Sequence, residues 1–135
     1  MNMSKNATAK KLKSCVKRHL KAKGHMVYKT LIGGFIKERN YKTSPGWPDL
    51  MVFSGNGKCI FIECKNETGK LRDTKIIRFH DLQRLGHTIY IARPKEVEPL
   101  FRLEKLADIT YEEYMAAKER TTNWRQQKGR VIEGE

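Results

Sequence analysis

The chain has 135 residues, which is enough to bury one modest hydrophobic core but rarely two. Lysine and arginine outnumber aspartate and glutamate by 28 to 15, and the formal net charge of +13 favours a polyanionic partner. No apolar run is long enough for a transmembrane span, and the lysine-bearing N-terminus lacks the hydrophobic stretch of a signal peptide. The three cysteines have no Cys-x-x-Cys spacing, which disfavours a disulfide framework and a zinc ribbon. We therefore expect a protein of the reducing cytoplasm.

The first 37 residues hold ten lysines and arginines and no acid. Within them, apolar residues recur at helical spacing from Leu12 to Leu20, which predicts an amphipathic first helix. A charged helix face is usually just solvated surface, but one of uniform sign is better explained by contacts with phosphates. Membrane-surface binding is the weaker alternative, because the helix lacks aromatic anchors. The lysines of this helix that we expect to contact DNA are Lys10, Lys13, Lys17 and Lys21.

A hairpin is predicted in the middle of the chain, after a first strand at 25–30 and an insertion-like loop at 31–44. Residues 49–53 and 59–65 are both rich in strand formers, and the glycines and asparagine of 54–58 between them are typical of a tight turn. These residues therefore predict two adjacent antiparallel strands.

The register of this hairpin decides which side chains meet. If the hairpin is symmetric about Asn56, Asp49 faces Glu63, and Lys65 lies on the same face as Glu63. A two-residue turn at Asn56 and Gly57 would shift the register by one and put Asp49 on the opposite face. The sequence leaves both registers open.

The symmetric register would bring two carboxylates together. Two such charges about 4 Å apart repel by about 4 kcal/mol at the effective dielectric constant near a protein surface, and a divalent cation would remove that cost. Oxygen ligands indicate Mg²⁺ or Mn²⁺, and Lys65 could hold a phosphate or orient an attacking water. The alternative is a simple salt bridge between Glu63 and Lys65.

The loop before Asp49 favours the metal site over that salt bridge. Gly46 permits a positive φ or a close backbone approach, and Pro48 fixes φ just where the acid must be aimed. Trp47 could stack on a base or sugar, or lie buried over the hairpin.

The pattern continues with a helix and a strand. After a turn at 66–69, Asp73 or Thr74 is expected to cap a helix that Gly86 ends, and 87–92 alternates as a strand. His80 in this helix, like His19 in the first, has no evident orienting carboxylate, so we expect packing or phosphate contact from both.

Beyond Arg93 the sequence is less informative. Residues 94–106 are predicted as a short helical stretch interrupted at Pro99, and Thr110 with Glu113 forms a capping box that opens a final helix. Its face of Tyr111, Tyr114 and Met115 needs a partner surface, either the domain itself or a second copy. Residues 124–130 are predicted to be a basic, weakly ordered tail.

Several of these motifs together resemble a known family. The VRR-NUC (virus-type replication-repair nuclease) branch of the PD-(D/E)XK nucleases carries similar sequences, and the likeness covers roughly residues 9–97. The matching segments here are Gly46-Trp-Pro-Asp-Leu50, Glu63-x-Lys65, Gly69-Lys-Leu71 and the stretch from Leu85 to Pro94.

The resemblance implies an α/β fold with a restriction-endonuclease-like core in the order α-β-β-β-α-β, a mixed sheet flanked by helices. It also implies that Asp49, Glu63 and the backbone carbonyl of Cys64 would bind the metal, and that Lys65 would be the catalytic lysine. Residues 1–97 would form the nuclease domain, with 98–135 as a helical extension and basic tail of the same compact unit.

Two positions depart from the family pattern. The glutamate that the family often has early in its first helix would fall near Ala9, and no acid precedes Glu38, whose surroundings read more simply as a solvated loop. Many members also carry a glutamine where this chain has Lys75, which we add to the predicted DNA contacts. These departures are compatible with a site for one metal ion and argue against a second metal.

The sequence therefore predicts a Mg²⁺- or Mn²⁺-dependent DNA endonuclease of replication, repair or recombination, acting as a homodimer. A DNA-binding protein with a weakened nuclease fold is the alternative, and a basic RNA-binding or assembly protein is a third hypothesis.

Overall fold

The computed structural model describes residues 5–30 and 46–133, with side chains described over 10–30 and 46–122. The predicted loop at 31–44, including Glu38, lies outside these residues. None of the described helices is long and apolar enough to cross a lipid bilayer.

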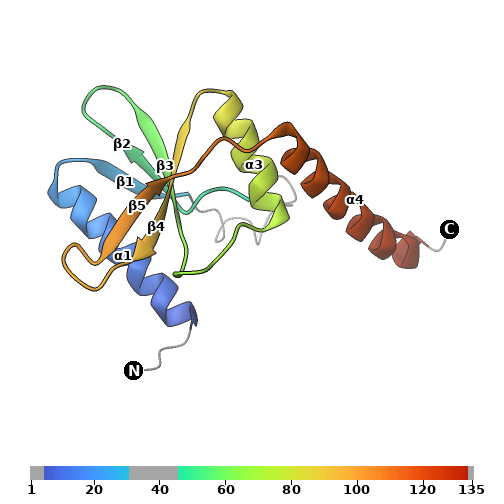
Figure 1. The fold of residues 1–135 in the computed structure, drawn as a ribbon, viewed down its shortest axis with the longest axis horizontal. Coiled ribbons are helices and arrows are strands. Elements are labelled where there is room, and N and C mark those ends of the chain that lie inside the picture. The colour runs from blue at the N-terminus through green and yellow to red at the C-terminus, as the bar shows by residue number, and fades with distance from the viewer. Residues whose placement is uncertain (1–4, 31–45, 134–135) are drawn as a thin grey trace.

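The fold is a five-stranded sheet with helices packed on it (Figure 1). The strand order is β1-β2-β3-β4-β5, and β3 and β4 are parallel while all other neighbours are antiparallel. Over the described residues the order α-β-β-β-α-β is thus confirmed, and a fifth strand and a last helix follow it. The elements are α1 (Lys5–Ala22), β1 (Met26–Lys29), β2 (Leu50–Phe53), β3 (Cys59–Cys64), α3 (Asp73–Arg84), β4 (Thr88–Pro94), β5 (Phe101–Lys105) and α4 (Tyr111–Glu133).

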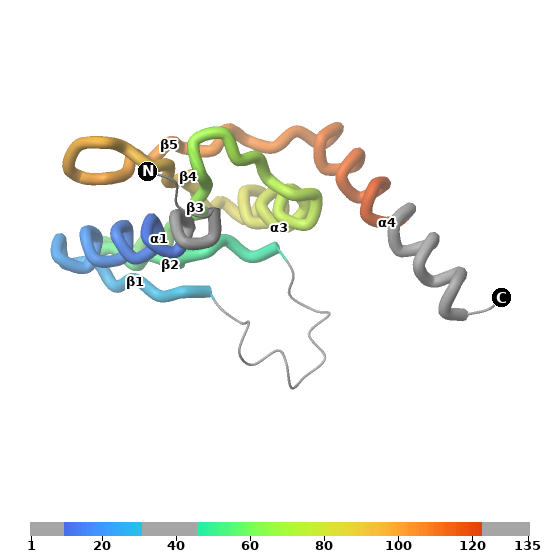
Figure 2. The backbone as a smooth tube through the Cα atoms, turned by 90° about the horizontal axis from the view of Figure 1, so that it is seen from below, coloured from blue at the N-terminus to red at the C-terminus, as the bar shows by residue number. Residues whose placement is uncertain are grey.

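Helices α1 and α3 cover opposite faces of the sheet. Successive residues of a strand point to opposite faces, and Ile62 packs in one core cluster while Phe61 packs in the other. The cluster on the Ile62 side contains Leu12 and Val16 of α1, and the cluster on the Phe61 side contains Phe79 and Leu82 of α3. Figure 2 shows α1 beside β1, whereas α4 leaves the sheet on the side of α3.

The start of α4 agrees with the predicted capping box. Thr110 N donates to Glu113 Oε1 at 2.9 Å, and Glu113 N donates to Thr110 Oγ1 at 3.0 Å. The helix packs on α3, and in this contact the Tyr114 ring stacks on His80 with the ring centroids 4.1 Å apart. Tyr111 and Met115 stay exposed. The predicted apolar face is therefore divided, with only Tyr114 turned toward the domain.

Two predictions for the C-terminal third were wrong. Residues 94–106 are not a helical stretch, because β5 pairs along β4 and Phe101 is buried against the α1 side of the sheet. Residues 124–130 are not an irregular tail, because the backbone of α4 continues to Glu133.

The predicted cap of α3 was also wrong. The helix begins at Asp73, and the residue before it, Arg72, makes no side-chain cap hydrogen bond. The Asp73 carboxylate instead binds Arg120 of α4, with Nη2 2.9 Å from Oδ1. Gly86, with φ of +93°, follows the last turn as predicted.

Candidate active site

The β2–β3 hairpin has the symmetric register. Met51 pairs with Phe61 and Phe53 pairs with Cys59, while Ser54 N donates to Lys58 O at 3.0 Å across the turn. The next pair in this register is Asp49 with Glu63. Of the two registers that the sequence left open, the structure therefore has the symmetric one.

Backbone amides tie the two acids together in a reciprocal arrangement. Asp49 N donates to Glu63 Oε1 at 3.2 Å, and Cys64 N donates to Asp49 Oδ2 at 2.9 Å. Each carboxylate is thus held by the backbone of the opposite strand, so the pair keeps a fixed geometry even though its charges repel.

The loop that carries Asp49 is held from two sides. Gly46 has φ of +84°, and a Cβ there would lie 2.3 Å from Thr74 O in the first turn of α3. Pro48 is buried, and its carbonyl accepts a hydrogen bond from Thr30 Oγ1 while Thr30 N donates to Asp49 O at 3.0 Å. Both roles expected of Gly46, a positive φ and a close approach, are confirmed.

Three lysines from three elements surround the acid pair. Lys65 Nζ lies 3.6 Å from Glu63 Oε2, Lys13 Nζ lies 3.7 Å from Asp49 Oδ1, and Lys75 contacts both acids. The Lys75 ammonium is 2.9 Å from Glu63 Oε1 and 4.0 Å from Asp49 Oδ1, and it also donates to Trp47 O at 2.9 Å. The position of Lys75 against both acids was not anticipated from the sequence.

Glu63 is buried, with only 2 % of its surface exposed. Burial raises the pKa of this carboxyl above its ordinary value and the Asp49 charge raises it further, whereas Lys75 and Lys65 oppose the shift. Burial also raises the pKa of the Cys64 thiol to about 12. The thiol is therefore neutral in the metal-free protein. The Cys64 ligand that the family resemblance implied is the backbone carbonyl, and this role stays a prediction.

The chemistry of the donor set fits a hard divalent cation. The backbone amides of Asp49 and Cys64 bind Glu63 Oε1 and Asp49 Oδ2. The other carboxylate oxygens, Asp49 Oδ1 and Glu63 Oε2, face lysine ammonium groups. Carboxylate oxygens are the ligands that Mg²⁺ and Mn²⁺ prefer. Among the described residues no third acid, histidine or cysteine completes a metal-binding cluster with them. A single ion bound by two carboxylates, with remaining positions for water and phosphate, is what this set can hold.

The predicted DNA-contacting lysines of α1 lie along one helical stripe, at spacings of three and four residues. Lys13 joins the acid pair, Lys10 and Lys21 are exposed, and Lys17 is half-buried. The stripe therefore runs from the candidate site along α1, although contact with DNA stays a prediction for these lysines and for Lys75.

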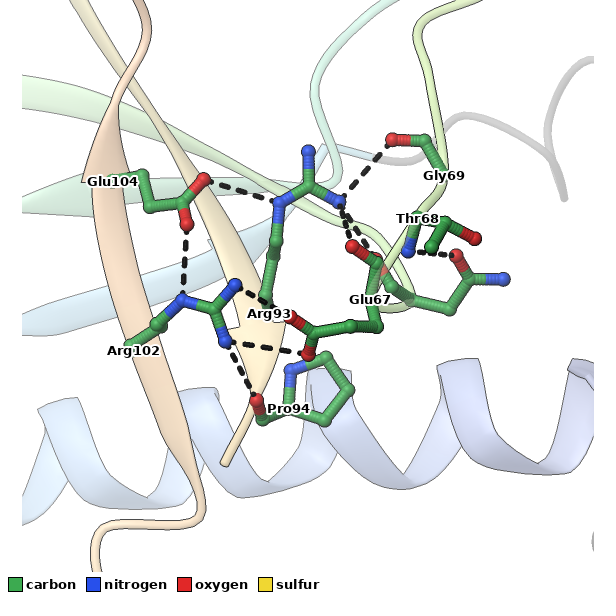
Figure 3. Close-up of polar contacts among 8 residues, drawn as sticks. Glu67, Thr68, Gly69, Arg93, Pro94, Arg102 and Glu104 are labelled. Atoms are coloured by element: carbon green, nitrogen blue, oxygen red, sulfur yellow. Dashed lines mark hydrogen bonds and ion pairs between the residues drawn. The ribbon is translucent and has the colours of Figure 1, made fainter. Parts of the chain in front are cut away.

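An arginine cluster behind the site orders the turn that follows Lys65 (Figure 3). Arg93 Nη1 donates to the carbonyls of Asn66 at 2.7 Å and Gly69 at 3.2 Å, and Arg93 Nε pairs with Glu104 at 3.1 Å. A Cβ at Gly69 would lie 3.3 Å from Lys65 Cδ, so this turn packs on the Lys65 stem. Sequence reasoning missed Arg93, whose only signal was a charged residue at the end of a predicted strand.

Trp47 and the histidines of α1 and α3 make packing contacts. Trp47 lies against Phe61 with centroids 6.2 Å apart, and the Arg78 guanidinium sits 5.1 Å over its ring. Trp47 is thus partly buried over the hairpin. This agrees with the second of its two predicted roles, burial rather than stacking on a base or sugar. His80 is buried under Tyr114, and His19 makes an edge contact with Phe101.

Comparisons with known proteins support the fold. No family model and no curated protein matches the sequence. A solved structure described as a VRR_NUC domain aligns with a TM-score of 0.51 and 21% sequence identity, over 62% of this chain and 81% of that one. The family resemblance drawn from the motifs is thereby confirmed for the fold. The chain has a VRR_NUC-like α/β fold, a mixed sheet flanked by helices, and Asp49, Glu63 and Lys65 meet at one end of its central hairpin.

Proposed function

We propose that the protein is a divalent-metal-dependent DNA endonuclease that hydrolyses phosphodiester bonds during replication, repair or recombination. Asp49, Glu63 and the Cys64 carbonyl would hold one Mg²⁺ or Mn²⁺ ion, and DNA would lie along the lysine stripe of α1. The nuclease-like fold supports this proposal at the level of the protein class.

The observation that carries the proposal is the convergence of two carboxylates and a lysine at the end of β3. The two carboxylates repel each other, three lysine ammonium groups offset that repulsion, and the amides of Asp49 and Cys64 hold the pair in place. When bound, a divalent ion polarises a phosphate and makes water a better nucleophile.

The side chains divide the remaining work. Lys65 is 18% exposed, so its ammonium is shielded from solvent but close enough to the surface to meet a phosphate. We assign it the stabilisation of negative charge that develops on the scissile phosphate. The turn held by Arg93 restricts the Lys65 stem, so the ammonium is positioned before the substrate arrives.

A cleavage assay tests this function. Duplex, single-stranded, flap and four-way junction DNA would be incubated with the protein in Mg²⁺, Mn²⁺ or EDTA. Asp49→Asn and Glu63→Gln should abolish cleavage and leave DNA binding in EDTA almost intact, while Arg84→Gln removes an exposed charge from α3 as a control. Cleavage at the wild-type rate by either acid variant would show that the site is assigned wrongly.

One observation favours a second candidate, a DNA-binding protein that keeps the fold with little catalysis. Lys75 already places a positive charge against both carboxylates, where it competes with a metal ion. In that case DNA would bind without divalent metal, and no DNA structure would be cut in Mg²⁺ or Mn²⁺.

A further inference from the structure

Lys75 differs from the other two lysines at the acid pair in what it contacts. Among the described side chains it is the one whose ammonium lies within 4.0 Å of both acids, since Lys13 reaches only Asp49 and Lys65 only Glu63. Its hydrogen bond to Trp47 O fixes the ammonium in this position. The side chain is only 19% exposed, so solvent screens its charge incompletely.

The formal charge of the cluster opposes a metal ion when DNA is absent. Three ammonium groups against two carboxylates leave a net charge of +1, and a divalent cation would raise it to +3. A DNA phosphate brings negative charge, and it also offers the ammonium groups an alternative partner. Metal and DNA should therefore bind better together than either does alone.

We propose that Lys75 makes metal binding at Asp49 and Glu63 depend on DNA. In the free protein its ammonium neutralises the two acids and keeps the site closed to divalent ions. When DNA binds, the ammonium turns to a phosphate, and the carboxylates become available as ligands. This inference rests on the proposed function, because it assumes that these two acids are the metal ligands.

The coupling is reciprocal by thermodynamic necessity. If DNA raises the metal affinity by some factor, the metal raises the DNA affinity by the same factor. The protein would then load its metal only on a substrate, which limits metal-dependent chemistry in the DNA-free state.

The test measures Mn²⁺ binding directly. Electron paramagnetic resonance of free Mn²⁺ gives the affinity with and without a short phosphorothioate duplex, for wild type, Lys75→Gln, Lys75→Met and the control Arg84→Gln. Wild type and control should gain on the order of tenfold or more in Mn²⁺ affinity when DNA is added. Both Lys75 variants should bind Mn²⁺ tightly without DNA and lose most of that gain. Melting temperatures report folding, and Lys75→Gln keeps a hydrogen-bond donor toward Glu63 if Lys75→Met proves unstable.

Two results would overturn the inference while leaving the nuclease function intact: equal Mn²⁺ affinity with and without DNA in a wild type that cleaves, or a full DNA-dependent gain in both Lys75 variants. A different result would overturn the function as well. If Asp49→Asn binds Mn²⁺ as tightly as wild type does when DNA is present, or if neither wild type nor any variant binds Mn²⁺ with DNA, the two acids are not the metal ligands.

Discussion

Gly46→Ala should destabilise the protein because the added methyl group has no room. The Cβ would lie 2.3 Å from Thr74 O and 2.8 Å from Thr74 C, and these backbone atoms belong to the first turn of α3. The residue also has φ of +84°, which costs an L-amino acid about 1–2 kcal/mol. Overpacking adds about 1–3 kcal/mol. The expected loss of about 2–5 kcal/mol is a large share of the stability of a small domain.

Gly57→Ala is the matched control for the backbone term. Gly57 has nearly the same φ, +77°, but a Cβ there would meet nothing within 4 Å. It should therefore lose only about 1–2 kcal/mol. The difference between the two variants isolates the contact with Thr74.

Urea denaturation followed by circular dichroism measures both variants. With a slope of about 2 kcal/mol/M, the clash should separate the two midpoints by about 0.5–1.5 M. Equal midpoints would refute the reasoning, because they would show that the loop can move away from α3 without cost. Gly46→Ala should also lose more nuclease activity than Gly57→Ala does, because the loop that contains Gly46 positions Asp49.

The remaining predictions concern the charges of the site and the last helix. In EDTA, Glu63→Gln should raise the melting temperature at pH values above about 4.5, because burial and Asp49 raise the pKa of Glu63 and its ionisation therefore costs stability. The gain should vanish well below pH 4.5, where the carboxyl is protonated in both the folded and the unfolded state. Lys65→Met should lower kcat by about 10² in a single-turnover assay and leave Mn²⁺ affinity almost unchanged, and a loss of affinity alone would make the lysine structural. A variant that combines Lys10→Ala, Lys17→Ala and Lys21→Ala should bind every DNA sequence more weakly, and the slope of log affinity against log salt should fall by about 0.9 for each phosphate that is no longer neutralised; an unchanged slope would move the DNA surface off α1. Tyr111→Ser combined with Met115→Ser, both at exposed positions, should convert a dimer to a monomer in light scattering, and a wild-type monomer would exclude a dimer through this face.

The central hairpin could be predicted because its signals are local. The turn residues 54–58 and the alternation in the flanking strands restrict the pairing to two registers, and the structure selects the symmetric one. The positive φ of Gly46 followed from the same kind of reasoning.

The missed features depend on contacts between distant segments. β5 has only Phe101 and Leu103 as apolar residues, and it forms because β4 offers an open edge, which no local pattern reveals. Lys75 reaches the acids because the start of α3 packs beside the loop at Gly46. Neither β5 nor the position of Lys75 could be predicted without the tertiary arrangement.

β5 places charged side chains at one edge of the sheet. An edge strand presents unpaired backbone groups that a strand of another molecule can join, and charged side chains are a common defence. β5 is the last strand of the sheet, and it carries Arg102, Glu104 and Lys105, with Arg102 also paired to Glu67 at 2.7 Å. A foreign strand that approached this edge would have to separate or desolvate these ion pairs. We therefore expect the charges of β5 to keep the sheets of neighbouring copies from joining along this edge.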